Sequence, residues 1–124
     1  MIHVAVKSRQ AFIFLLAALA WHLPAVSSAQ SYPAKPVRYV VPFPAGASPD
    51  IVARLITERL GQMWGQQVLV ENRAGAGGTV GAAFAARSPA DGYTLFQCNI
   101  ASSAIAPSLY AKIPYDHERD FAPL

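Results

Sequence analysis

The sequence is poor in the residues that most often build metal, redox and nucleic-acid sites. Cys98 is the only cysteine among 124 residues, so an internal disulfide is excluded. His117 is the only histidine after residue 30, and one histidine with one cysteine gives no zinc-ligand spacing. Only 14% of the residues are charged, and no basic run or basic helix face follows residue 30. Nucleic acid is therefore not expected as a partner, and no metal or cofactor is predicted.

The first 29 residues have the three-part pattern of a secretory signal peptide. Lys7 and Arg9 form a basic leader, an apolar core of ten residues follows at positions 11–20, and small residues end at Ala29. The apolar core is shorter than the ~20 residues that a membrane span needs. We therefore expect export to the periplasm, with residues 30–124 as the folded part and no membrane span after cleavage. An uncleaved anchor or a buried helix is the alternative.

After this leader, short apolar runs alternate with helical patterns. They predict strands and helices in the order β-α-β-α-β-α, at residues 37–41, 49–64, 67–71, 79–87, 93–97 and 103–110. The near-continuous apolar content of the first run is typical of a parallel strand that is covered on both faces. The predicted fold class is therefore α/β, a parallel sheet with helices on both faces joined by right-handed crossovers. Residues 112–124 show no period and are expected to form an extended loop.

The helix expected at residues 49–64 carries a regular apolar stripe, which predicts that this face packs into the core. The residues of the stripe are Ile51, Val52, Leu55, Ile56, Leu60, Met63 and Trp64.

Three loops are expected at the carboxyl edge of this sheet, where parallel α/β folds bind ligands: residues 42–50, 72–79 and 98–103. The first loop ends in a helix-start signature, with Ser48 as the cap, Pro49 at the first helical position and Asp50 in the first turn. Free N–H groups at such a turn attract small anions, so we interpret the loop as half of a carboxylate site. The alternative is an ordinary strand-to-helix turn.

The second loop is rich in glycine but does not match a nucleotide-binding motif. The dinucleotide fingerprint needs glycines at positions one, three and six, and counting from Gly75 the sixth position is Val80. A Walker lysine is also missing. The loop either wraps a small ligand closely or forms a tight turn with close helix–sheet packing. Beside it, Arg73 is either a carboxylate clamp or the partner of Glu71 in a surface ion pair.

The third loop offers polar groups and the one thiol. Cys98 is either a nucleophile, with His117 folding back as its base, or a small buried hydrophobic residue. Asn99 either binds a ligand or stabilises a left-handed turn. Ser102 and Ser103 either cap the next helix or donate hydroxyl groups to a ligand. A small exported α/β enzyme that uses Cys98 or a loop serine is therefore the alternative function.

Four sequence blocks, in order, resemble one known family. The blocks begin at Tyr32 (YPAKP, then VVPFP, Gly46 and Asp50), at Val70 (VENR, then GAGG and Gly81), at Asp91 (DGYTL) and at Pro107 (PSLY, then PYD and DFAP). They resemble the periplasmic substrate-binding receptors of tripartite tricarboxylate transporters, the TctC or Bug family. The resemblance implies a two-lobed α/β binding protein that closes on a small carboxylate, is not an enzyme, and serves a membrane permease.

The resemblance also implies which residues contact the ligand, and where the chain departs from its family. The first loop would contribute Phe43, Gly46, Ala47 and Ser48, and the third loop Asn99, Ser102 and Ser103. The family often has Pro-Gly-Gly where this chain has Ala45-Gly46-Ala47, and it usually has proline at position 74 and asparagine at position 106, which are both alanine here. The chain corresponds to the N-terminal part of the first lobe, so it is expected to be truncated. A module that presents a ligand to a membrane sensor is a further alternative.

Overall fold

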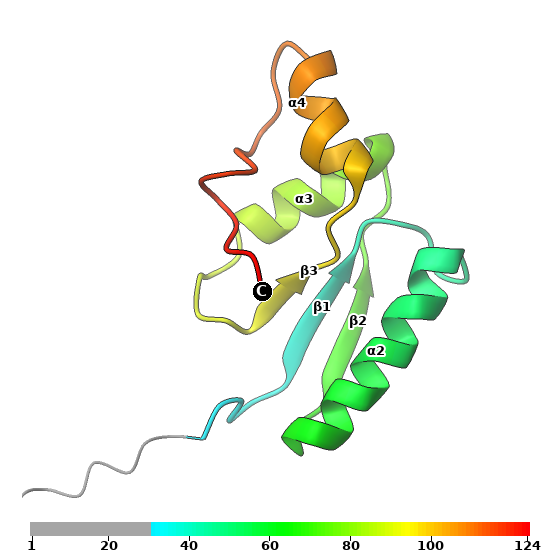
Figure 1. Ribbon diagram of the computed structural model, residues 1–124, viewed down its shortest axis with the longest axis vertical. Coiled ribbons are helices and arrows are strands. Elements are labelled where there is room, and N and C mark those ends of the chain that lie inside the picture. The colour runs from blue at the N-terminus through cyan, green and yellow to red at the C-terminus, as the bar shows by residue number, and fades with distance from the viewer. Residues whose placement is uncertain (1–30) are drawn as a thin grey trace, which may run out of the picture. The chain divides into compact units, whose positions relative to one another are not determined.

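The computed structural model of the chain describes residues 31–124, and the predicted signal peptide lies outside this part. Figure 1 shows the described elements. They are β1 (Val37–Val41), α2 (Ser48–Trp64), β2 (Val68–Asn72), a 3₁₀ turn (Ala76–Gly78), α3 (Thr79–Ala86), β3 (Thr94–Phe96), a π-helical turn (Ala101–Ile105) and α4 (Ala106–Leu109). The predicted order of strands and helices is confirmed, and residues 112–124 contain no helix or strand, as expected. No helix within residues 31–124 is both long enough and apolar enough to cross a membrane.

The three strands form one parallel sheet in the order β2-β1-β3. The chain steps from β1 to β2 and then back across β1 to β3, so right-handed crossovers place α2 and α3 on opposite faces. The contacts agree, because Arg38 on one face of β1 lies over the ring of Phe84 in α3, whereas α2 packs over β2 and β1 (Figure 1). The predicted parallel sheet with helices on both faces is therefore confirmed.

The core is built around the central strand. Val37, Val40 and Val41 of β1 are fully buried, as their position between two strands and two helices requires. On the α3 face, small alanines let the helix lie close to the sheet, and Tyr115 and Phe121 from the last segment pack against it. The ring centroid of Phe121 lies 5.4 Å from that of Phe96. The irregular segment therefore covers the α3 side of β3.

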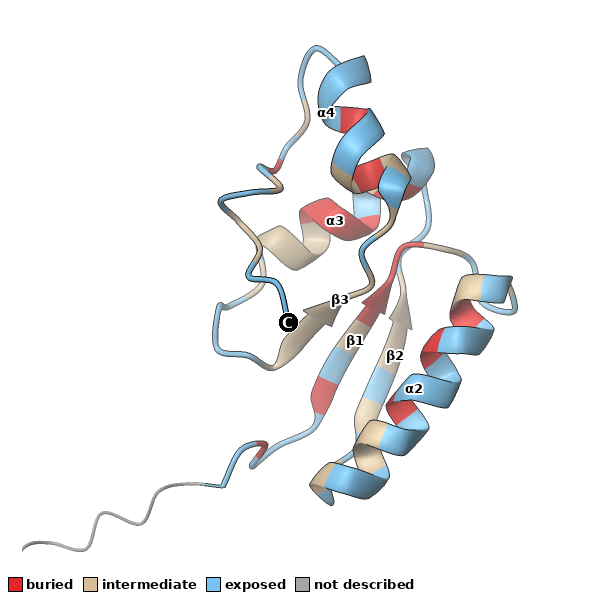
Figure 2. Cartoon of the chain, viewed as in Figure 1, coloured by how far each residue is buried: buried red, intermediate tan, exposed pale blue. Residues whose placement is uncertain are grey.

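The prediction that the apolar stripe of α2 packs into the core is largely wrong. The buried residues of this helix are Asp50, Ala53 and Thr57 (Figure 2). These side chains are small or hydrogen-bonded, so they are the ones that let the helix approach the sheet. Five apolar residues of the stripe are instead 41–68% exposed: Ile51, Val52, Leu55, Ile56 and Met63. Leu60 and Trp64 are half-buried.

Two valine-to-alanine substitutions test this division between core and surface. Val40→Ala removes two methyl groups from a fully buried site, so it should lower the free energy of unfolding by about 2 kcal/mol. Val52→Ala changes a residue that is 49% exposed on a helix, so its effect should stay within about 0.5 kcal/mol. Urea unfolding followed by circular dichroism measures both values. Equal losses would contradict the observed burial.

Candidate functional site

The three strand-end loops meet at Gly78. A Cβ atom built on this glycine would lie 2.7 Å from Nδ2 of Asn99 in the third loop and 3.3 Å from Cβ of Pro42 in the first. Gly81, one turn further, is equally close to Pro42 and to the carbonyl oxygen of Arg73. The glycine-rich segment therefore makes the tight turn and close helix packing that its sequence allowed. It also brings the three predicted loops to one edge of the sheet.

The first loop turns into α2 without the expected cap. Ala47 is the N-cap residue, with φ of −70° and ψ of 158°, and it makes no side-chain capping bond. The prediction that Ser48 caps the helix is wrong, because Ser48 is already its first residue. Gly46 has a φ of +82°, so the turn needs a glycine at this position, while the methyl group of Ala47 sits on ordinary extended backbone.

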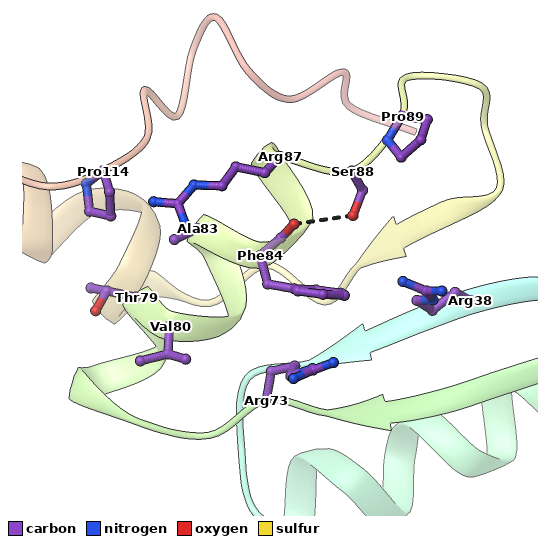
Figure 3. A pocket seen from close by; sticks show the side chains of 10 residues that line it. All are labelled: Arg38, Arg73, Thr79, Val80, Ala83, Phe84, Arg87, Ser88, Pro89 and Pro114. Carbon is purple, nitrogen blue, oxygen red and sulfur yellow. Dashed lines mark hydrogen bonds between the residues drawn. The ribbon is translucent and has the colours of Figure 1, made fainter.

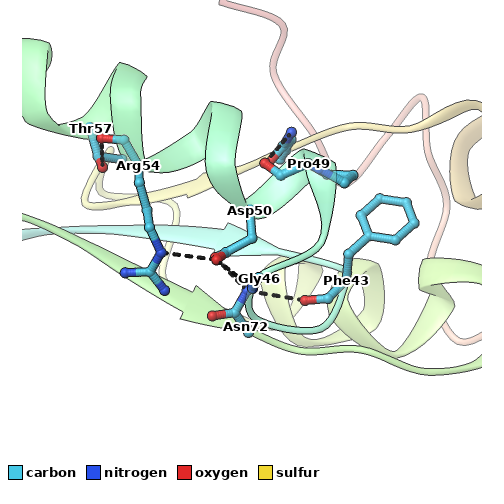
Figure 4. A network of polar contacts seen from close by, with 8 residues as sticks. Phe43, Gly46, Pro49, Asp50, Arg54, Thr57 and Asn72 are labelled. Atoms are coloured by element: carbon cyan, nitrogen blue, oxygen red, sulfur yellow. Dashed lines mark hydrogen bonds and ion pairs between the residues drawn. The ribbon is translucent and has the colours of Figure 1, made fainter.

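Asp50 connects the first turn of α2 to the loop that precedes it. Its Oδ2 accepts the backbone N–H of Gly46 at 2.9 Å and Nε of Arg54 at 2.9 Å. Its Oδ1 accepts Nδ2 of Asn72 at 2.8 Å, and the same amide donates to the carbonyl oxygen of Phe43 at 3.1 Å (Figure 4). The carboxylate is only 1% exposed. One buried charge therefore joins the first loop, the start of α2 and the end of β2.

This network also controls the ionisation of Asp50. The hydrogen bond from Arg54, followed by those from Gly46 and Asn72, lowers the pKa of Asp50 to about 2. The carboxylate is therefore ionised at neutral pH and lies at the positive end of the α2 dipole, as the sequence predicted. Arg54 and Asn72 were not predicted as its partners. Spacing by four residues on a helix is a signal for Arg54, whereas the pairing with Asn72 depends on the strand arrangement.

Asn99 organises the third loop. Its Oδ1 accepts the backbone N–H of Ser102 at 3.0 Å, and its Nδ2 donates to the hydroxyl oxygen of Ser102 at 2.9 Å. The prediction that Ser102 or Ser103 caps the next helix is wrong, because both lie within the π-helical turn and α4 has no side-chain cap. Ser102 is fully buried, and its carbonyl oxygen accepts the hydroxyl of Tyr115 at 2.6 Å. The side chain of Ser102 therefore stabilises the loop through its hydrogen bond with Asn99.

Cys98 is exposed, so its interpretation as a small buried hydrophobic residue is wrong. Its Sγ lies 2.8 Å from Oγ of Ser103. The hydrogen bonds described for residues 31–124 connect the thiol with this serine and not with His117, whose ring lies 5.5 Å from that of Phe121. The arrangement is a thiol–hydroxyl contact beside the strand end, without the base that a nucleophilic cysteine needs.

A hollow of about 590 Å³ lies on the α3 side of β1 and β2 (Figure 3). The residues that line it are Arg38, Arg73, Thr79, Val80, Ala83, Phe84, Arg87, Ser88, Pro89 and Pro114. The guanidinium groups of Arg38 and Arg73 lie over the Phe84 ring, and both pair with Glu71. The predicted Glu71–Arg73 ion pair is confirmed. The ligand residues that the resemblance implies do not line this hollow, whereas Arg73, the possible carboxylate clamp, does.

The predicted ligand residues differ in their exposure and in the hydrogen-bond donors that remain without a partner. Gly46 and Ser48 are exposed, Phe43, Ala47, Asn99 and Ser103 are half-buried, and Ser102 is buried. The N–H of Gly46 is already bound to Asp50. In the part of the chain that the structure describes, the N–H and hydroxyl of Ser48 have no hydrogen-bond partner. Ser48 therefore offers both an N–H and a hydroxyl to a ligand.

The strand-end loops of this parallel sheet gather polar groups at the edge where parallel α/β folds bind ligands. The family described as "Tripartite tricarboxylate transporter family receptor" matches residues 52–124. The chain belongs to this family.

Known proteins resemble the chain over most of its length. Protein BugT of Bordetella pertussis is 46% identical over 98 residues, which are 78% of this chain and 30% of BugT. The solved structure of the periplasmic binding protein BugD is 42% identical, with a TM-score of 0.70 over 74% of this chain and 30% of BugD. The structure of MatC from Rhodopseudomonas palustris with bound malate is 39% identical, with a TM-score of 0.69 over 74% of this chain and 31% of MatC.

The chain is much shorter than the proteins it resembles. It spans 27–31% of the length of the curated relatives that it matches. Its described part therefore corresponds to a portion of one receptor, in agreement with the truncation expected from the sequence.

Two glycine-to-alanine substitutions test the close approach at Gly78. Gly78→Ala places a methyl group against Asn99 at a φ of +94°, so it should cost about 1–3 kcal/mol and shift the side-chain amide resonances of Asn99. Gly46→Ala also has a positive φ but no heavy atom near the new methyl, so it should cost about 1 kcal/mol and leave Asn99 unchanged. Urea unfolding and NMR measure both effects. An unchanged Asn99 signal in Gly78→Ala would contradict the contact.

The Asp50 network predicts a loss of stability in acid. The pKa of Asp50 is about 2 in the fold and ~3.9 in an unfolded chain, so its contribution is complete above pH ~4 and disappears as the pH falls toward 2. Asp50→Asn should be less stable than wild type at pH 7, and its stability should fall less between pH 5 and 2.

Asp91→Asn is the matched control for this experiment. Asp91 is exposed, and hydrogen bonds from the Tyr93 backbone and Lys35 lower its pKa. Its loss should change stability less than the loss of Asp50, because an exposed ion pair contributes little. Unfolding curves at several pH values give the free energy of unfolding of the wild type and of both variants. A wild-type pH profile in Asp50→Asn would contradict the role of the buried carboxylate.

Proposed function

We propose that the chain is part of an exported receptor that binds a small carboxylate for a tripartite tricarboxylate transporter. The observation that carries the proposal is the likeness to MatC, a family relative solved with malate, over 74% of this chain. Residues 1–29 would act as the signal peptide, and residues 30–124 would form the N-terminal part of the first lobe. The permease subunits of the transporter would receive the ligand from the complete receptor.

The proposed ligand residues lie on the first and third loops. Ser48 would donate its N–H and hydroxyl to a ligand carboxylate, and Phe43 and Ala47 would form an apolar wall beside it. Gly46 would shape the turn, since its own N–H is bound to Asp50. From the third loop, Asn99, Ser102 and Ser103 would complete this side of the site, and Ser102 would act through Asn99 because its hydroxyl is buried against that side chain.

This site would bind its ligand without carrying out a reaction or using a cofactor. The nearby cations already have acidic partners, since Arg54 pairs with Asp50 and Arg73 with Glu71. The charge of the ligand would therefore be met by neutral donors at the start of a helix, which suit an anion that must be released again. The contact between Cys98 and Ser103 supports a structural role for the thiol.

Thermal unfolding in the presence of organic acids tests the proposal. Malate, adipate and citrate would each be added to the 124-residue chain, with glucose as a neutral control. A ligand at 100 times its dissociation constant should add ~2.7 kcal/mol to the stability, which is a clear rise in midpoint. A cooperative transition that no acid moves would contradict carboxylate binding by this chain.

A serine substitution then tests the site. Ser48→Ala removes a free hydroxyl and should weaken binding of the active acid by roughly 5–10-fold. Ser108→Ala is the matched control, because its exposed hydroxyl lies on α4 and faces the carbonyl oxygen of Ala104. It should leave the affinity unchanged. Equal affinities for Ser48→Ala and wild type would contradict the proposed role of Ser48.

A further inference from the structure

The hollow beside α3 carries more positive than negative charge. Three guanidinium groups line it, those of Arg38, Arg73 and Arg87, and no acidic residue of the described part is among its lining residues. The carboxylate of Glu71 pairs with both Arg38 and Arg73. Arg87 forms no ion pair within residues 31–124. The hollow therefore has three cations for one carboxylate, and this excess of positive charge suits further acidic groups.

Arg38 and Arg73 are held in place before any partner binds. Their guanidinium carbons lie 5.5 and 4.3 Å from the centre of the Phe84 ring. Nε of Arg38 also lies 3.1 Å from Oε2 of Glu71. The two arginine side chains are nevertheless 48% and 46% exposed, so part of each five-donor guanidinium remains accessible. A partner would thus meet two ordered donor groups without the entropy cost of fixing long side chains.

An apolar strip on α3 lies between these two arginines and Arg87. The strip consists of Val80, Ala83 and Phe84, which share one face of the helix because they are three and four residues apart. Arg87 extends back along α3 toward Ala83, whereas the other two arginines lie by the strands beyond the Phe84 ring (Figure 3). Val80 is 47% exposed, so the strip is open to solvent. The hollow therefore offers positive charge on both sides of an apolar floor.

The size and the openness of the hollow favour a polypeptide over an enclosed small molecule. Its volume is about 590 Å³. The helix rises ~10 Å from Val80 to Arg87, a length that roughly three residues of an extended chain cover. Pockets for small molecules bury most of the ligand surface, whereas Arg38, Val80 and Arg87 are all exposed here. A segment that lies along α3 would gain its affinity from several contacts along its length.

We propose that this hollow is a docking surface for an extended acidic segment of a partner protein, in which an apolar side chain lies between two carboxylates. The apolar side chain would pack on the apolar strip. One carboxylate would pair with Arg87. The other would accept N–H groups of Arg38 and Arg73 while Glu71 keeps its own bonds to them. None of the proposed ligand residues lines the hollow, so the proposal does not depend on carboxylate binding at the first and third loops.

Capped synthetic peptides test the chemistry of this surface. The probe is acetyl-Glu-Ser-Leu-Ser-Glu-amide, because alternate residues of an extended chain point to the same side. One control peptide has Gln for both Glu residues, and the other has Ser for Leu. In an NMR titration of the 124-residue chain, the probe should shift the ring resonances of Phe84 and the Nε–H resonance of Arg87 until they saturate. Each control should bind at least roughly 5-fold more weakly.

Three outcomes of the titration would overturn the proposal. The first is that the probe leaves the Phe84 and Arg87 resonances unchanged, including the case in which it shifts only those of the first and third loops. The second is that either control peptide binds as tightly as the probe. The third is that N-acetyl-leucine binds as tightly as the probe, which would indicate a site for a small acid instead of a polypeptide.

Arginine substitutions separate a specific ion pair from general attraction. Arg87→Gln should weaken binding of the probe by roughly 3–5-fold, whereas Arg87→Lys keeps the charge and should retain most of the affinity. Arg59→Gln is the matched control, because Arg59 is an exposed arginine of α2 and its loss changes the net charge equally. It should leave the affinity unchanged. Equal losses from Arg87→Gln and Arg59→Gln would overturn the proposal, since net charge would then explain binding.

A pair of valine substitutions tests the apolar strip without changing the charge, and it does not require that the Arg87 variants fold. Val80→Ser should weaken binding of the probe by roughly 3-fold, because about half of this side chain is still exposed before the partner covers it. Val52→Ser is the matched control, since Val52 is 49% exposed on α2. It should leave the affinity unchanged. Equal affinities of the two variants for the probe would overturn the proposal.

Discussion

The buried carboxylate of Asp50 is the constraint on which the strand-end loops depend. A carboxylate that is 1% exposed cannot stay charged unless every part of it is satisfied, and here it receives hydrogen bonds from Gly46, Arg54 and Asn72. These three donors come from the first loop, from α2 and from the end of β2. A change in the position of any one of these elements would leave the charge unpaired. The network therefore fixes the first loop before any ligand is present.

Close packing at Gly78 and Gly81 has the same effect on the other two loops. Neither position has room for a Cβ atom, because Pro42, Asn99 and the carbonyl oxygen of Arg73 fill the space. Asn99 is held against Gly78 and in turn holds Ser102. The polar network reaches Phe43 and the glycine contacts reach Pro42, which are neighbouring residues of one loop. A rigid edge of the sheet results from both, and a rigid edge loses little entropy when it binds a ligand.

The sequence predicted what depends on local pattern and missed what depends on tertiary contact. The apolar run at β1 and the glycines after β2 could be assigned because burial and tight turns restrict residue type locally. The cap at Ser48 was predicted wrongly because α2 begins one residue earlier than the sequence suggested, so that Ser48 is its first residue and Ala47 its N-cap. The pairing of Asp50 with Asn72 spans 22 positions and follows from the register of β1 and β2, which no local pattern specifies. The apolar stripe of α2 was predicted to lie in the core because a helical period does not show which of its residues another element covers.

Charge pairing around the strand ends limits how a receptor of this kind can hold an acid. Arg54 faces Asp50, Arg38 and Arg73 share Glu71, and Lys35 pairs with Asp91. An acid that recruited one of these cations would leave its carboxylate partner without compensation, and for the buried Asp50 that loss would be large. Neutral donors such as Ser48 can change partners at lower cost. In the proposed function, the first loop would therefore meet an acid with the neutral donors of Ser48 while these ion pairs stay intact.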